Sequence, residues 1–325
     1  MLYLESGSTD PAYNLALEQY AFDTLSQNDE IAMLWQNSDS VIIGLHQNAM
    51  GEIDREYLES NSIQLIRRLS GGGAVFHDLG NLNYTFISHH SDASSLDFAD
   101  SSRPIADALI SMGLPVEFRG RNDLTIDGKK FSGNARYYRD GKLMHHGTVL
   151  YSLDFDKMSK VLRVPEDKLF SKGIKSVRSR VVNLCDYVNM PFEEFRCAIR
   201  NSIVGDIPAY QLGTNDLDSI ETIRRSRYGT WEWNYGKSPG FSIEKHRRIE
   251  GFGAIRLCMS AENGRISAFS TDGDYFGLCT YDDVAAALHG AKLERAELLK
   301  ALSRLPLGNY YENLQAEELV RLILE

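Results

Sequence analysis

Short apolar runs alternate with helical patterns through the first two thirds of the chain. Six runs are rich in β-branched or aromatic residues and are bounded by turn-forming residues, which is typical of strands. They are residues 31–35, 40–44, 63–67, 81–88, 124–126 and 147–152. Because some of them follow one another without a helix between, the pattern predicts an α+β fold rather than a regular alternation of strand and helix.

Three helices are predicted between these strands. Residues 11–25 have Asp10 as an N-cap and Pro11 at the first helical position, where proline is favoured. Residues 54–60 form a shorter candidate, and residues 102–112 end at Gly113, a typical helix stop.

A different pattern begins near Phe241, and the domain boundary is expected near residue 245. Residues 248–259 and 266–271 predict a hairpin, with Asn263-Gly264 as its tight turn. Helical stretches follow at residues 281–288, 295–302 and 315–324. We therefore expect a large domain over residues 1–245 and a small α+β domain over residues 246–325.

Composition is that of an ordinary globular protein. Of 325 residues, 43% are apolar and 25% charged, which allows a real core and argues against wholesale disorder. The net charge of −10 disfavours general nucleic-acid binding, because nucleic-acid binders are usually basic. No apolar run approaches the ~18 residues of a membrane-spanning helix. We expect neither nucleic acid nor a membrane as a partner.

The N-terminus and the cysteines point to the cytoplasm. Residues 1–6 lack the basic start and apolar stretch of a signal peptide. The four cysteines form no CxxC pair, which makes a zinc site improbable and fits reduced thiols in a cytoplasmic protein. They are Cys185, Cys197, Cys258 and Cys279.

The most informative segment is residues 67–78, Arg-Arg-Leu-Ser-Gly-Gly-Gly-Ala-Val-Phe-His-Asp. Consecutive glycines let backbone N–H groups approach a ligand closely, and successive N–H groups form an anion-binding concavity. Arg67 and Arg68 add positive charge that suits a phosphate or a carboxylate. A flexible turn with solvated arginines is the alternative. The segment matches neither the usual dinucleotide motif nor the P-loop.

A lysine follows at a second glycine-containing segment. Residues 127–135, Asp-Gly-Lys-Lys-Phe-Ser-Gly-Asn-Ala, contain Lys130 beside an open backbone surface. An ammonium group there would stabilise negative charge building on a phosphoryl or acyl oxygen. A solvated surface lysine is the alternative, and Asn122 and Asp123 alone would be read as a polar loop.

Two further segments carry candidate chemistry. His145 and His146 are adjacent in a predicted strand and must point to opposite faces, so one is expected at the pocket and the other in a structural role. Residues 172–183 hold four cations within nine residues. They form either an exposed turn or a loop that closes over a polyphosphate or an adenylate.

Together and in this order, these segments resemble the lipoate–protein ligase family of the bacterial two-domain type. The resemblance rests on residues 67–78, 120–124, 130–135, 145–148, 172–183 and 231–236. It covers most of residues 1–240, and the tail is similar to the family's accessory domain.

The resemblance implies a fold and a reaction. The fold is a mixed sheet flanked by helices, shared with biotin–protein ligases, plus a small α+β accessory domain. The reaction has two halves: with Mg²⁺, lipoate and ATP give lipoyl-AMP and pyrophosphate, and a lysine of a carrier protein then expels AMP. The implied carriers are lipoyl domains of 2-oxoacid dehydrogenases and the glycine-cleavage H-type protein.

The resemblance also assigns residues. Lys130 stands where the family has the catalytic lysine that contacts the acyl carbonyl and the α-phosphate. Residues 73–76 and Arg68 match the nucleotide-contacting part of the glycine segment, and its other members match the acyl pocket or its rim. All residues implied to bind ATP or lipoyl-adenylate are Arg68, Ser70, Gly71, Gly72, Gly73, Ala74, Val75, Phe76, His77, Asn122, Asp123, Ser176, Val177, Arg178, Ser179 and Arg180.

Three alternatives remain open at this stage. A lipoyl or octanoyl transferase of the same fold works without ATP and can use a cysteine nucleophile, for which Cys185 is the cysteine nearest the motifs. A biotin ligase is disfavoured because no Gly-Arg-Gly-Arg-type loop is present. A non-catalytic lipoate-binding module is disfavoured by the intact Lys130 and glycine segment.

Overall fold

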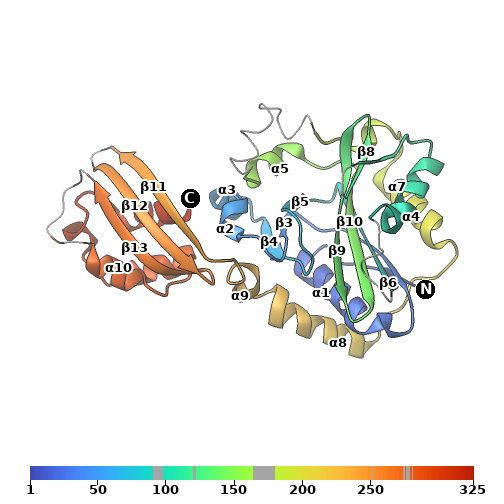
Figure 1. Cartoon of the computed structure of the whole chain (residues 1–325), viewed down its shortest axis with the longest axis horizontal. Helices are drawn as coiled ribbons and strands as arrows, with labels where there is room; N and C mark the ends of the chain where they lie inside the picture. Colours follow the sequence, from blue (N-terminus) through green and yellow to red (C-terminus); the bar gives the residue numbers. More distant parts are fainter. Residues whose placement is uncertain are drawn as a thin grey trace. The chain divides into compact units, whose positions relative to one another are not determined.

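The computed structural model describes residues 1–90, 98–119, 122–163, 180–250, 252–273, 275, 279 and 281–325. Its chain divides into two compact units (Figure 1). Unit 1 comprises Met1–Leu45 and Tyr57–Thr230, and unit 2 comprises His46–Glu56 and Trp231–Glu325. Residue 245, where the sequence predicts a boundary, lies within the first strand of the unit 2 sheet.

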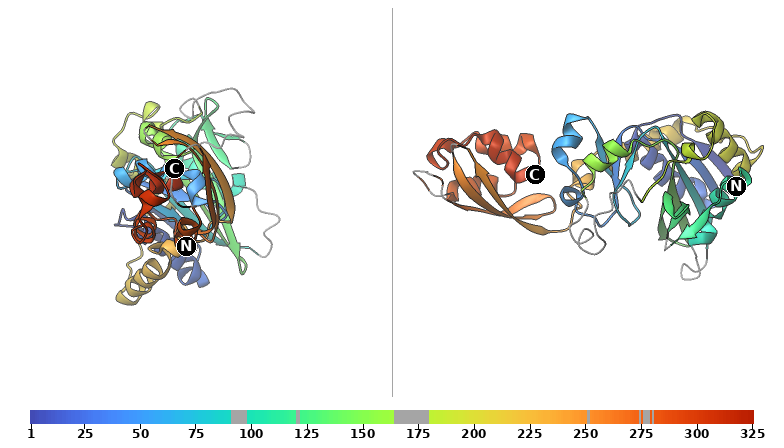
Figure 2. Two further views of the ribbon diagram at one scale, coloured as in Figure 1. Left: turned by 90° about the vertical axis from the view of Figure 1, so that its left-hand side faces the viewer. Right: turned by 90° about the horizontal axis from the view of Figure 1, so that it is seen from above.

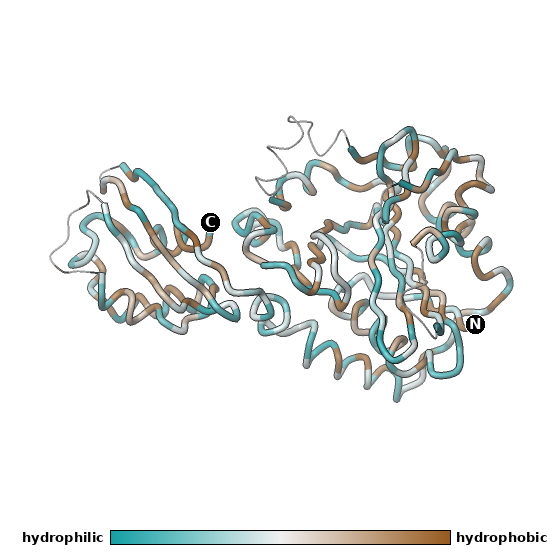
Figure 3. The backbone as a smooth tube through the Cα atoms, viewed as in Figure 1, coloured by the Kyte–Doolittle hydropathy of each residue, from teal (hydrophilic) through white to brown (hydrophobic). Residues whose placement is uncertain are grey.

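A seven-stranded mixed sheet forms the centre of unit 1. Its order is β1-β2-β6-β10-β9-β8-β7, with β1 and β2 parallel and the other neighbours antiparallel. The strands are β1 (Leu2–Glu5), β2 (Ile31–Trp35), β6 (Asn81–His89), β7 (Glu117–Arg119), β8 (Asp123–Ile126), β9 (Lys129–Arg139) and β10 (Lys142–Leu150). The hydrophilic tip of the β9–β10 hairpin stands out in Figure 3.

A second, three-stranded sheet carries the glycine segment. Its order is β4-β3-β5, in which β3 (Ser40–Ile43) pairs parallel with β4 (Gln64–Arg67) and antiparallel with β5 (Val75–His77). The glycine segment is therefore the connection between β4 and β5, two strands held together by β3 between them.

Helices lie on both faces of the main sheet (Figures 1 and 2). Leu82 and Tyr84 of β6 belong to one core with residues of α4 (Phe98–Ser111) and α7 (Phe192–Val204). Alternation along a strand turns the side chains of Asn81, Asn83 and Thr85 to the opposite face. That face meets α1 (Pro11–Asp23), α5 (Phe155–Val161) borders β5, and α8 (Thr214–Ile223) packs beside α1.

Helix α1 is buried on nearly all sides. Asp10 caps it as predicted, accepting the Ala12 backbone N–H at 3.0 Å. Only Tyr13 and Asp23 of its residues are not buried. Glu18 is therefore carried into the interior, where a carboxyl group needs hydrogen-bond donors.

Unit 2 has its own sheet and its own core. The antiparallel strands β11 (Phe241–Ile249), β12 (Gly253–Glu262) and β13 (Arg265–Gly273) lie in that order. Their apolar side chains pack with α10 (Asp282–Leu288), α11 (Arg295–Leu302) and α12 (Ala316–Leu324). The short helices α2 (Ala49–Glu52) and α9 (Trp231–Asn234) complete the unit, and α3 (Arg55–Ser60) starts in it and ends in unit 1.

The fold class is confirmed as α+β with a mixed sheet flanked by helices. The Asn263-Gly264 turn is also confirmed, with φ of 50° and 70° at the two residues. One strand prediction was wrong: residues 248–259 are not continuous, because β11 ends at Ile249 and β12 begins at Gly253. Within the described ranges, no helix is long and apolar enough to cross a membrane.

Candidate active site

A cavity of about 160 Å³ opens in unit 1 between the α1-facing side of the main sheet and the glycine segment. Apolar groups and a few polar groups line it, which is typical of a small-molecule site. The lining residues are Leu15, Trp35, Ile42, Arg68, Gly72, Gly73, Ala74, Val75, His77, Asn83, Asn122, Lys130, Gly133, Asn134, Ala135, His146, Gly147 and Thr148.

The glycine segment is held against the end of β3. The Leu45 backbone N–H donates to the Ser70 carbonyl at 2.8 Å. A Cβ atom on Gly44 would lie 2.1 Å from the Gly72 carbonyl oxygen, so a side chain at residue 44 cannot be accommodated without moving the segment. Gly72 itself has φ of +96°, a conformation that L side chains rarely adopt. Glycine is required at both positions by the protein alone.

Both arginines of the segment point inward instead of into solvent. Arg67 donates to the carbonyls of Gly44 and Leu45, at 3.0 and 3.1 Å. Arg68 donates to the Ile42 carbonyl and to several groups of the glycine segment. Burial lowers the pKa of each guanidinium to about 10, which leaves both charged at neutral pH. The arginines fix the shape of the segment and give it a buried positive charge.

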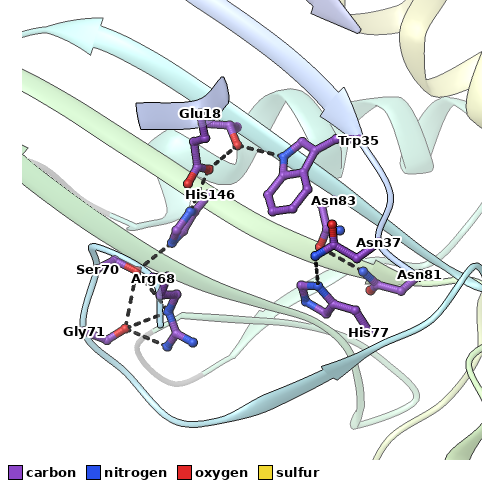
Figure 4. Close-up of polar contacts among 11 residues, drawn as sticks. Glu18, Trp35, Asn37, Arg68, Ser70, Gly71, His77, Asn81, Asn83 and His146 are labelled. Carbon is purple, nitrogen blue, oxygen red and sulfur yellow. Dashed lines mark hydrogen bonds and ion pairs between the residues drawn. The ribbon is translucent and has the colours of Figure 1, made fainter. Parts of the chain in front are cut away.

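Ser70 connects the glycine segment to a buried histidine and a buried glutamate (Figure 4). Ser70 Oγ lies 2.6 Å from His146 Nε2, and His146 Nδ1 lies 2.8 Å from Glu18 Oε1. Arg68 Nε–H donates to Ser70 Oγ at 3.0 Å, so the one serine proton can go to His146 Nε2. With the serine proton on this bond, His146 Nε2 accepts and its Nδ1 donates to Glu18.

The far end of this chain reaches the cavity wall. Thr85 Oγ1 donates to Glu18 Oε1 at 2.6 Å and accepts the Trp35 indole N–H at 3.0 Å. The chain therefore runs from the Trp35 ring, which lines the cavity, to the Arg68 guanidinium of the glycine segment. Each hydrogen bond along the chain joins a donor to an acceptor, and such connected networks make a site rigid.

The order of Glu18, His146 and Ser70 is that of a hydrolytic triad. The surroundings do not support nucleophilic catalysis. Ser70 is 1% exposed and is absent from the cavity lining, and its oxygen already accepts a hydrogen bond from Arg68. We therefore assign this serine the role of holding the glycine segment in place.

Lys130 stands at the other side of the cavity. Its Nζ lies 2.7 Å from Asp123 Oδ1, and both side chains are about one-third exposed. A Cβ on Gly133 would lie 2.7 Å from the same Nζ, so the ammonium group rests over that glycine. The Lys130 backbone exchanges hydrogen bonds with the Arg180 carbonyl and the Val182 N–H, at 2.8 and 3.0 Å. A charged, partly exposed ammonium group thus faces a water-accessible opening.

Asn122 is fixed from the neighbouring strand. Its Nδ2 donates to the Asn134 carbonyl at 2.6 Å, and Asn134 Nδ2 donates to the Asn122 carbonyl at 3.0 Å. Asn134 Oδ1 also accepts the Tyr84 hydroxyl. These contacts hold the end of β8 beside Lys130.

The structure brings together most of the residues that the sequence singled out. Arg68, Gly72, Gly73, Ala74, Val75, His77, Asn122 and Lys130 line the cavity. Gly71 and Ser70 adjoin them in the segment, and Asp123 contacts Lys130. Phe76 is buried and is not a lining residue, because it alternates with Val75 and His77 along β5. The Arg180 side chain is exposed, whereas Ser176, Val177, Arg178 and Ser179 lie outside the described residues.

The prediction about the paired histidines is confirmed. His146 lines the cavity, and His145 lies on the opposite face, where its Nε2 is 3.1 Å from Ser102 Oγ. Burial is the main cause that lowers the pKa of His145 to about 3.

Several lining residues were not predicted from the sequence. Trp35, Asn83 and Asn134 were not selected, and neither was Glu18 behind them. One signal was available: Glu18 directly follows the apolar run Leu15-Ala16-Leu17 in α1, where a charged residue is unexpected.

Comparisons with known proteins give the family. Residues 10–204 match the lipoyl protein ligase A/B catalytic domain, and residues 238–323 match the bacterial lipoate protein ligase C-terminus. Lipoate-protein ligase LplJ of Bacillus subtilis is 38% identical over 99% of this chain and 100% of its own length. Lipoate–protein ligase 1 of Staphylococcus aureus is 36% identical over 97% of each chain. The chain belongs to the lipoate–protein ligase family.

Solved ligases of the family have the same fold. The bipartite lipoate protein ligase of Thermoplasma acidophilum, studied with its E2 lipoyl domain, superposes with a TM-score of 0.63 and 31% identity. It covers 73% of this chain and 96% of its own. A lipoate-protein ligase A solved with ATP gives a TM-score of 0.62 at 29% identity, over 73% and 98% of the two chains. Membership in this family makes the chain a lipoate–protein ligase.

Gly73 offers a test of which glycines serve the ligand. Apart from its chain neighbours, no atom of the described residues lies within 4 Å of a Cβ built there, so these residues do not require glycine at this position. We expect Gly73→Ala to leave the thermal midpoint unchanged and to raise the KM for ATP about tenfold, the equivalent of ~1.4 kcal/mol. Initial rates at varied ATP measure the effect.

Gly72→Ala is the matched comparison, because its φ of +96° and its contact with Arg68 predict a lower thermal midpoint as well. An unchanged KM for ATP in Gly73→Ala would show that nucleotide does not approach the segment at that residue.

Proposed function

We propose that the cavity holds lipoate with its carboxylate at Lys130 and that the glycine segment holds the phosphates of ATP. A carboxylate oxygen attacks the α-phosphorus, the bond to the bridging oxygen breaks, and pyrophosphate leaves. A carrier lysine amine then attacks the acyl carbon of lipoyl-AMP, loses a proton, and expels AMP. The observation that best supports this proposal is the position of the Lys130 ammonium group at the cavity opening, 2.7 Å from Asp123 Oδ1.

Lys130 contributes electrostatic stabilisation. Negative charge grows on the phosphoryl oxygens in the first step and on the acyl oxygen in the second. An ammonium group already in place stabilises both, because no reorganisation is required as the charge develops. The ion pair with Asp123 and the backbone bonds on both sides of Lys130 keep the group in position before substrate arrives.

The glycine segment contributes geometry and charge for the nucleotide. The open backbone at Gly73 and Ala74 lines the cavity and presents N–H groups of the kind that bind anions. Arg68 supports this surface from beneath, because its guanidinium bonds the carbonyls of Gly71 and Gly73 and turns them away from the phosphates.

Mg²⁺ fits this arrangement. No group of three or more potential metal ligands occurs among the described residues. Mg²⁺ bound with a nucleotide needs only one or two carboxylates besides phosphates and water. Asp123 supplies a partly exposed carboxylate next to Lys130 and would hold the ion, which neutralises phosphate charge when bound.

The acceptor is proposed to be a lipoyl-type carrier domain. A relative with the same fold has been studied with its E2 lipoyl domain, which supports carriers of this kind. We extend the proposal to 2-oxoacid dehydrogenase lipoyl domains and to the glycine-cleavage H-type protein. Residues 1–245 are assigned the catalytic role and residues 246–325 the accessory role. The need for ATP and the free cysteines support a place in the cytoplasm.

Exchange of labelled pyrophosphate into ATP tests the first half-reaction. We expect exchange that requires added lipoate, because only an adenylating enzyme reverses lipoyl-AMP formation. A transferase that moves the acyl group between carriers, or a binding module, gives no lipoate-dependent exchange, and that outcome contradicts the proposal.

Cys185 provides the complementary check on the transferase alternative. Its thiol is exposed, lies 3.9 Å from Asp186 Oδ1 and is absent from the cavity lining. Partial desolvation by the surrounding residues, followed by the nearby Asp186 carboxylate, raises the pKa of this thiol, which disfavours the thiolate that a nucleophile requires. We therefore expect Cys185→Ser to transfer lipoate to a carrier domain at the parental rate, measured by mass spectrometry. Loss of transfer would restore the cysteine mechanism.

A further inference from the structure

Two nitrogen atoms in the cavity wall have no protein partner. His77 Nε2 and Asn83 Nδ2 are buried, and neither has a hydrogen-bond partner among the described residues. Both residues line the cavity. Unpaired buried polar groups are rare in proteins, so two of them in residues that line the same cavity indicate a ligand that supplies an acceptor.

The protonation of His77 follows from its neighbours (Figure 4). Asn14 Nδ2 is a donor, because it bonds the backbone carbonyls of Ser8 and Gln36. It also bonds Asn37 Oδ1, which leaves Asn37 Nδ2 to donate to His77 Nδ1 at 3.1 Å. His77 Nδ1 is thus an acceptor. Burial lowers the pKa of His77 to about 3, so the neutral ring carries its proton on Nε2.

Asn83 adds the second donor. Its Oδ1 accepts from Asn81 Nδ2 at 2.9 Å, and its buried Nδ2 has no partner among the described residues. The His77 ring lies edge-on to Trp35, with 6.3 Å between the ring centroids, and Asn83 is paired with Trp35 in the register of β2 and β6. The two donors therefore belong to the same end of the cavity.

The spacing of the strands in the main sheet gives the distance from this end of the cavity to Lys130. Asn83 lies opposite Thr148 on the next strand, and Thr148 Oγ1 accepts the backbone N–H of Gly133 on the strand after that. The Lys130 ammonium group rests over Gly133. Two strand spacings separate Asn83 from Gly133, which is about 9–10 Å. That span is comparable to an extended lipoate molecule from carboxylate to ring.

Resting on the proposed function, which places the carboxylate at Lys130, we infer that His77 and Asn83 bind the ring sulfur atoms of lipoate. Sulfur is a weak hydrogen-bond acceptor, and a plain alkyl chain such as that of octanoate offers none. The cavity lining also includes apolar residues such as Leu15 and Ile42. An apolar wall alone gives similar binding free energies for lipoate and octanoate, because small differences in apolar contact produce little discrimination. The two N–H donors supply the discrimination.

The first experiment uses the unmodified enzyme. Pyrophosphate exchange is measured with lipoate and with its carbocyclic analogue, in which methylene groups replace both ring sulfurs. Shape and chain length are matched, so a difference reports the contribution of sulfur as an acceptor. We expect kcat/KM to be about three- to tenfold higher for lipoate, the range of one ordinary hydrogen bond. Equal values for the two acids overturn the inference.

The second experiment assigns the effect to residues. In Asn83→Leu and His77→Phe, the ratio of kcat/KM for lipoate to kcat/KM for the carbocycle should fall toward one, whatever the change in kcat/KM for the carbocycle itself. Ile42→Val is the control: it alters the same cavity without removing a donor, and should change both acids alike. A preference that persists in both donor variants overturns the assignment. Absence of exchange with either acid in the unmodified enzyme would instead contradict the proposed adenylation.

Discussion

Replacing Lys130 with alanine is expected to lower lipoate-dependent pyrophosphate exchange by about 10²- to 10³-fold, the usual cost of removing one preorganised charge donor. The reason is its position. The ammonium group lies over Gly133 at the cavity opening, and nothing else at the opening among the described lining residues combines positive charge with partial exposure. Initial exchange rates at saturating lipoate and ATP measure the loss.

Lys129→Ala is the matched control for this prediction. Lys129 is the preceding residue of β9, is exposed, and is not part of the cavity lining. Its removal should leave exchange at the parental level. Lys130→Ala activity within about threefold of the parent, with an unchanged thermal midpoint, would remove Lys130 from the mechanism.

Replacing Gly44 with alanine is expected to reduce exchange by about 10²-fold, the cost of displacing a catalytic element by roughly 1 Å. Gly44 does not touch the cavity, so the effect must be transmitted. Its new methyl group would occupy the space of the Gly72 carbonyl oxygen, 2.1 Å away. The backbone there cannot rotate aside as a side chain can, so the glycine segment itself has to move.

The readout for Gly44→Ala separates displacement from unfolding. Exchange is measured well below the thermal midpoint of the variant, and the KM for ATP should rise along with the fall in kcat. Gly7→Ala serves as the control, because a Cβ on Gly7 meets nothing within 4 Å. Parental kinetics in Gly44→Ala would show that the segment tolerates the shift.

The parts of the site that the sequence predicted are those encoded locally. Consecutive glycines restrict what a segment can do, so residues 67–78 were found as an anion site candidate before the fold was known. Adjacent histidines in a strand diverge by geometry, which placed His145 and His146 on opposite faces. Asp10 and the Asn263-Gly264 turn were predicted for the same reason, since caps and turns depend on a few neighbouring residues.

The parts that were missed depend on distant pairing. Strand β9 mixes charged, aromatic and small residues without a clear alternation, and its conformation comes from β8 and β10 on either side. Glu18 acquires its role only because α1 lies against β6 and β10, where Thr85 and His146 meet it. Asn83 could not be distinguished from an ordinary strand asparagine until the cavity was seen.

The route of the chain between the two units has a consequence for biosynthesis. The polypeptide leaves unit 1 after Leu45, returns at Tyr57 and leaves again after Thr230. Residues 46–56 therefore emerge from the ribosome long before residues 231–325, with which they pack. Ala49 N–H bonds Ser238 Oγ at 3.1 Å, and Arg55 donates to the Leu293 carbonyl.

Until the last third of the chain has been made, this early segment has no unit to join. Completion of unit 2 is thus a late event in synthesis, whatever the order in which unit 1 folds. For the same reason, a protein ended at Thr230 would not be a smaller ligase with one part cleanly removed. It would still contain residues 46–56 but not the rest of unit 2, so Met50 would lack the apolar core against which it packs.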